Sequence, residues 1–141
     1  IEMQLNPDDY IWLFYLPILY KDKNDFNKCK LLIESENIKS LCSFVGAETH
    51  PYNCWKFNQK NNQIEQFISN DVFRRQDLPD AWMLHHYLCF FQVKYFDNLN
   101  SELVSKDTYP FFIDNNKAKK LIEIDTLDDY KKWKKLREGK I

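Results

Sequence analysis

The chain has 141 residues, of which 44% are hydrophobic, and a formal net charge of −1. This length and apolar share are typical of one domain, or of part of one, that can bury a core. The near-zero charge excludes a general attraction to nucleic acid or to an anionic membrane surface, and no apolar run in the sequence reaches the length of a membrane span.

The N-terminal third predicts a strand, a helix and a second strand. Residues 9–19 are almost wholly apolar, which is typical of a central strand covered on both faces, with Pro17 at or beyond its end. Residues 24–36 predict a helix, and residues 40–45 a second strand. The core face of that helix holds Phe26, Cys29, Leu32 and Ile33. This order favours a right-handed crossover between two parallel strands.

The middle of the chain is less regular. Residues 53–58 predict a short strand, and the polar loop after it should be exposed. Residues 64–73 give no clear prediction, whereas the aromatic run at 82–93 predicts another strand. The chain as a whole therefore predicts an α/β fold with a mostly parallel sheet and a small antiparallel or irregular insertion at about 50–95.

The C-terminal third predicts a helical turn at 98–102, an extended segment at 109–113 and a turn at 115–119. A short strand at 121–124 should lead into a helix that starts near Leu127. The packing stripe of this helix recurs every three residues, at Leu127, Tyr130, Trp133 and Leu136. Asp125 and Thr126 precede the helix and can cap it.

Glu123 and Asp125 lie two residues apart at the end of this predicted strand, so they should point to the same side. Paired carboxylates in such a place suit a hard divalent cation such as Mg²⁺. The alternative is that acidic residues before a helix act only as caps.

Three of the four cysteines, Cys29, Cys42 and Cys89, stand among apolar residues, and no CxxC pair occurs. They predict buried, reduced thiols, which fits the cytoplasm. With only two glycines, the sequence offers no glycine-rich loop to cradle a nucleotide phosphate. The chain opens without a signal peptide and without an initiator Met, so we expect it to be processed or part of something longer.

Three segments, in this order, resemble the sugar-acid cytidylyltransferases that activate N-acylneuraminate and related nonulosonates. The first is DYIWLFYLPILYKDKNDF, at the place of the family's strand, Pro-containing turn and helix. The second is HPYNCWKF followed by RRQDLPDAW, which is similar to the family's His-Pro turn and Arg-Gln-x-Leu-Pro segment. The third is IEIDTLDDY, which is similar to its Asp-x-Asp-Thr ending.

The resemblance implies a sheet of the nucleotide-diphospho-sugar transferase (Rossmann-like) type. It covers residues 1–141 as the C-terminal part of a single domain, so the N-terminal phosphate-binding loop of the family would be absent or supplied by a separate segment or subunit. Residues 50–95 would form the dimerisation insertion of a homodimer.

The implied activity is that of a cytoplasmic nucleotidyltransferase, which transfers CMP from CTP to a nonulosonic acid and releases pyrophosphate. Asp125 and Glu123 would be catalytic and hold Mg²⁺. Arg75 would reach the sugar acid, with Arg74 and Gln76 beside it. His85 stands where many members have a sugar-contacting Asn. No nucleic acid and no membrane is implied as a partner.

Some residues depart from the family, and other roles remain open. Glu123 replaces an aspartate, and the turn reads FYLPI where the family has Gln-Pro-Thr-Ser-Pro. A non-catalytic oligomerisation or partner-binding relic of the family is therefore the alternative function. Arg74 or Arg75 could equally pair with Asp77 or Asp80, and the His85–His86 pair could simply pack within a strand.

Overall fold

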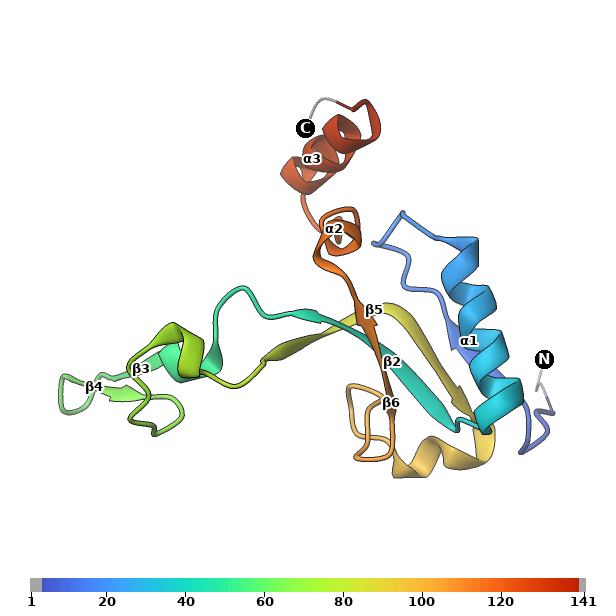
Figure 1. Ribbon diagram of the computed structural model, residues 1–141, viewed down its shortest axis with the longest axis horizontal. Helices are drawn as coiled ribbons and strands as arrows, with labels where there is room; N and C mark the ends of the chain where they lie inside the picture. Colours follow the sequence, from blue (N-terminus) through green and yellow to red (C-terminus); the bar gives the residue numbers. More distant parts are fainter. Residues whose placement is uncertain (1–3, 140–141) are drawn as a thin grey trace. The chain divides into compact units, whose positions relative to one another are not determined.

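The computed structural model describes residues 4–139, which divide into two compact units (Figure 1). The main unit contains the described parts of residues 1–45 and 84–141, and the insert unit contains residues 46–83. Each unit is considered by itself below.

The main unit is built on a four-stranded sheet with the order β1-β5-β2-β6. Its strands are β1 (Tyr10–Leu13), β2 (Ser40–Gly46), β5 (Trp82–Gln92) and β6 (Tyr109–Ile113). Strands β1 and β5 are antiparallel, whereas β2 and β6 form the parallel pair. Among the described strands only β2 and β6 are parallel, so the sheet is mostly antiparallel.

The prediction of a mostly parallel, Rossmann-like sheet is therefore wrong. The long apolar strand β5 lies between β1 and β2, so the two strands that flank helix α1 do not pair with each other. Hydrophobic pattern predicts burial of a strand but not the direction of its neighbours, because apolar runs suit the middle of either kind of sheet.

The prediction of a central strand over residues 9–19 is also wrong. Strand β1 has four residues and lies at the edge of the sheet. The apolar residues that follow it are largely exposed, with Leu16 81% and Phe14 56% accessible. A strand at this edge leaves one row of its backbone groups without a neighbouring strand.

Helix α1 (Lys23–Glu36) forms where the sequence predicts it. Asp22 caps its N-terminus by accepting a hydrogen bond from the Asn24 N–H, and Asn37 ends it in the left-handed region with φ of 52°. Cys29 is buried, and Phe26, Leu32 and Ile33 pack against the core.

The other two helices lie in the C-terminal third. Helix α2 (Asn115–Ala118) replaces the predicted turn, because the Asp114 side chain accepts hydrogen bonds from two N–H groups of its first turn. Helix α3 (Leu127–Arg137) starts as predicted. The structure has a 3₁₀ helix at Val93–Asn98. The helical turn predicted at 98–102 does not form, and the chain makes a non-helical turn there.

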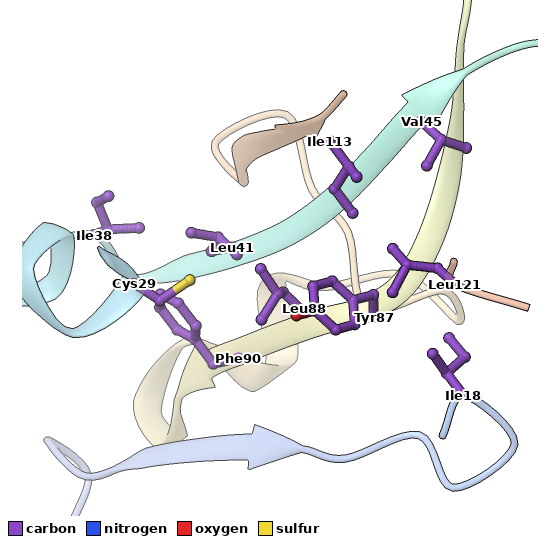
Figure 2. Close-up of a cluster of buried hydrophobic side chains, with 10 residues drawn as sticks. All are labelled: Ile18, Cys29, Ile38, Leu41, Val45, Tyr87, Leu88, Phe90, Ile113 and Leu121. Carbon is purple, nitrogen blue, oxygen red and sulfur yellow. The ribbon is translucent and has the colours of Figure 1, made fainter. Parts of the chain in front are cut away.

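The core of the main unit joins side chains from β2, β5, β6, α1 and three loop segments (Figure 2). Tyr87, Leu88 and Phe90 of β5 are at most 1% exposed. Ile18 and Leu121 reach the same cluster from segments outside the named strands and lie beside Tyr87. Core packing thus holds the loop after β1 against the segment that precedes α3.

The insert unit contains a β-hairpin of strands β3 (Trp55–Asn58) and β4 (Gln63–Gln66). Trp55, Phe57 and Ile64 lie on one face of it and are all more than half exposed. The opposite face holds an ion pair of 3.1 Å between Lys56 and Glu65. The hairpin therefore has one apolar face that the insert unit leaves open.

No helix among residues 4–139 is long and apolar enough to cross a membrane.

Candidate functional site

Three segments that are distant in sequence meet at residues 121–125. Glu123 forms an isolated antiparallel bridge with Ile18, and the Ile124 N–H donates to the Pro17 carbonyl over 3.1 Å. The His85 ring lies on the other side, with Nε2 3.3 Å from the Leu121 carbonyl. The strand predicted at 121–124 is reduced to this single bridge, because its backbone is paired with a loop and not with a strand of the sheet.

Glu123 and Asp125 are both exposed beside Tyr15. A side-chain hydrogen bond with Glu123, then the charges of Glu123 and Asp125, raise the pKa of the Tyr15 hydroxyl. Both carboxylates thus act electrostatically on one hydroxyl group.

The N-cap of α3 is Thr126, which accepts a hydrogen bond from the Asp129 N–H. The Asp129 carboxylate in turn accepts from the Thr126 N–H over 3.0 Å, which completes a capping box. The capping role is therefore filled by Thr126 and not by Asp125.

Within residues 4–139, no group of three or more His, Cys, Asp or Glu side chains is arranged to hold a metal ion. Glu123 and Asp125 nevertheless offer hard oxygen ligands two residues apart at the surface. Mg²⁺ keeps several of its waters and is commonly held by one or two carboxylates. The two side chains fit such a water-rich Mg²⁺ site.

His85 is a packed strand residue with one buried nitrogen. Because the Leu121 carbonyl can only accept, Nε2 carries the proton and Nδ1 is an acceptor. Nδ1 is buried and has no hydrogen-bond partner within the described part of the chain. Burial lowers the pKa of His85, so its imidazole is neutral at pH 7. The structure thus gives His85 the packed, hydrogen-bonded position of the alternative interpretation.

The other predicted substrate-binding residues, Arg74, Arg75 and Gln76, belong to the insert unit. The Arg74 guanidinium pairs with the Asp77 carboxylate, with Nε and Oδ2 2.8 Å apart, as the ion-pair alternative predicts. Arg75 and Gln76 lie in a 3₁₀ helix, Arg75–Asp77. Arg75 is thus held next to an ion pair that is exposed to solvent.

A buried polar network near the site was not predicted from the sequence. Lys117 of α2 lies 2.8 Å from a carboxylate oxygen of Asp22 and 2.6 Å from one of Asp25. The Tyr87 hydroxyl donates to Asp25 over 3.0 Å and accepts from the Asp22 N–H over 2.8 Å. The network joins the start of α1, helix α2 and strand β5, two residues from His85.

The charges in this network are strongly coupled. The hydrogen bond from Lys117 is the main reason why the pKa of Asp22 is lowered. Burial opposes the charge on Lys117, but hydrogen bonds and attraction to Asp22 and Asp25 outweigh it and raise its pKa. Burial raises the pKa of the Tyr87 hydroxyl, because it disfavours the charged phenolate. The sequence carries only a weak signal of this network, in the acidic residues that open a helix.

No protein-family model matches the chain, and no curated protein sequence matches it significantly.

Proposed function

We propose that the protein is a cytidylyltransferase of the sialic-acid type, which transfers CMP from CTP to a nonulosonic acid and releases pyrophosphate. The observation that carries the proposal is the meeting of two segments of the resemblance. The FYLPI turn and the IEIDT segment are joined by the Ile18–Glu123 bridge and by the hydrogen bond from Ile124 to Pro17.

In this reaction a sugar hydroxyl oxygen attacks the α-phosphorus of CTP, and the bond to pyrophosphate breaks. Catalysis of this kind depends on positioning and on neutralising negative charge. Glu123 and Asp125 would hold Mg²⁺, which when bound neutralises charge on the phosphate oxygens. Glu123 and Asp125 both raise the pKa of the Tyr15 hydroxyl, so this hydroxyl stays protonated beside the proposed site.

The substrate-binding part of the proposal rests on the insert unit. Arg75 would bind the sugar carboxylate through paired N–H donors, supported by Arg74 and Gln76. The open apolar face at Trp55, Phe57 and Ile64 supports a homodimer, because exposed aromatic clusters are typical of protein interfaces. Free thiols, among them the close pair Cys42 and Cys89, support a reducing compartment such as the cytoplasm.

The test is pyrophosphate release from CTP with a panel of nonulosonic acids and Mg²⁺. The protein is assayed alone and mixed with a phosphate-loop segment from a sugar-acid cytidylyltransferase. The variant Asp125→Asn removes one charge with little change of shape, so turnover should fall by a factor of about 10²–10³. Asp128→Asn, in the first turn of α3, is the matched control and should leave turnover within about twofold.

Equal turnover of Asp125→Asn and wild type at limiting Mg²⁺ would exclude the metal role. If no sugar acid gives turnover in either assay, and CTP with Mg²⁺ produces no thermal shift, transfer is ruled out and the non-catalytic alternative is favoured.

A further inference from the structure

A cavity of about 540 Å³ lies in the main unit between the segment before α1 and helix α3. Three basic side chains line it, from Lys21, Lys120 and Arg137. The rest of the wall is apolar or aromatic and comes from Leu19, Tyr20, Trp133 and Leu136. No acidic side chain is among the residues that line the cavity.

The positive charge in this cavity has no acidic ion-pair partner within the part of the chain that the structure describes. None of the ion pairs found among residues 4–139 uses Lys21, Lys120 or Arg137. Other lysines nearby in sequence do have partners: Lys117 pairs with two aspartates, and Lys131 pairs with Asp128. Three positive charges that share one concave wall repel each other, and a bound anion would remove that repulsion.

Two of the three cations are held in place. The Arg137 guanidinium carbon lies 5.5 Å from the centre of the Trp133 ring, a cation–π contact. The Lys21 ammonium group donates to the Tyr15 carbonyl over 3.1 Å, and burial lowers the pKa of Lys21. Cations that are already positioned lose less entropy when they bind an anion.

Trp133 forms a fixed wall of the cavity. Tyr130 stacks on it with ring centres 5.9 Å apart and an interplanar angle of 26°, and Arg137 also lies against the ring. With these neighbours in place, the cavity favours an anion over an aromatic ring stacked on Trp133.

We propose that this cavity binds a phosphate-type polyanion, either free pyrophosphate or the phosphate chain of a nucleoside triphosphate. A polyphosphate brings several negative charges into a small volume and so matches three cations better than a single carboxylate does. A cavity of about 540 Å³ falls in the range of small-molecule sites. The inference does not rest on the proposed transfer reaction, since binding here needs neither Mg²⁺ nor a sugar acid.

The test is titration of the ¹⁵N-labelled protein with inorganic pyrophosphate and, in a second arm, with CTP, both without Mg²⁺ and at low salt. The indole N–H signal of Trp133, assigned with Trp133→Phe, should shift and saturate. Lys120→Ala and Arg137→Gln should each raise Kd about tenfold, as expected for loss of one charge-assisted contact. Lys135→Ala, an exposed lysine of α3 that does not line the cavity, should change Kd less than twofold.

Saturation by pyrophosphate, with competition by CTP, would assign the site to the phosphate chain of a nucleotide. Saturation by pyrophosphate without competition would assign it to the free anion. The proposal is overturned if neither probe shifts the Trp133 signal at millimolar concentration, or if Lys135→Ala weakens binding as much as the two cavity variants do. A protein that binds pyrophosphate but shows no transfer would refute only the proposed function.

Discussion

Replacing Lys117 by Met tests the buried polar network. Among residues 4–139, Lys117 is the only cation paired with Asp25, whose side chain is 3% exposed; the change removes this cation and keeps a long apolar stem. Removal of one partner of a fully buried ion pair costs about 3–5 kcal/mol. Lys117 is 22% exposed, and the Tyr87 hydroxyl still donates to Asp25, so the cost should lie lower, at about 2–3 kcal/mol.

The assay is urea unfolding at pH 7, supported by a thermal scan. A loss of this size should lower Tm by roughly 6–10 °C in a chain of this length. Lys119→Met is the matched control, because Lys119 is an exposed lysine two residues away. Its effect should stay within about 0.5 kcal/mol. Equal stability of Lys117→Met and Lys119→Met would refute the assignment of stability to this network.

The same pair of proteins should differ in their response to acid. The pKa of Asp22 is lowered in the folded wild type, mainly by Lys117, from the ordinary value of 3.8. The ionised Asp22 carboxylate therefore adds to the free energy of unfolding above about pH 4. This stabilisation is lost as the pH falls through the lowered pKa of Asp22. The stability difference between the two proteins should therefore shrink between pH 7 and about pH 3, in unfolding curves taken at both ends.

Three more outcomes are expected. An aromatic disulfide reagent should label Cys54 quickly and the three buried thiols only after unfolding, because the reagent cannot reach a buried thiol. Burial also raises the pKa of the Cys29 thiol to about 12, which leaves little reactive thiolate. Rapid labelling of more than one thiol would contradict the packing. The edge strand β1 and the exposed run after it should cause self-association in light scattering, which Leu16→Lys should reduce; a compact wild-type monomer would disprove this. Phe57→Ser should convert a dimer to a monomer in size-exclusion chromatography with light scattering, whereas Lys56→Ser on the opposite hairpin face should not; a dimer that survives Phe57→Ser would exclude this interface.

Local patterns were sufficient to predict most of the individual elements. The helix periodicity and caps of α1 and α3 appear in the sequence itself, because a cap and a packing stripe depend on residues within a few positions of each other. Apolar runs likewise predicted strands β2, β5 and β6, and the burial of three cysteines. Helix α2 was not predicted, because its four residues are too few to show a helical period.

The candidate site was predictable only in part. The two-residue spacing of Glu123 and Asp125 predicted that these carboxylates act together, and their joint metal role stays a prediction. That Thr126 is the N-cap of α3, and that Glu123 and Asp125 raise the pKa of Tyr15, became known only from the folded chain. Capping can be shared or exchanged between neighbouring residues, and the choice depends on which segment packs beside them.

Strand order and the charged clusters were decided by tertiary structure. Whether β2 pairs with β1 or with β5 depends on which long-range contacts bury the most apolar surface, and an apolar run does not encode its neighbour. Lys117 and Asp25 are 92 residues apart, so no local pattern links them. The same holds for the basic cavity, which joins the segment before α1 to helix α3. Sequence determines which residues are charged or apolar, but the fold determines which charges are neutralised and which are left for a ligand.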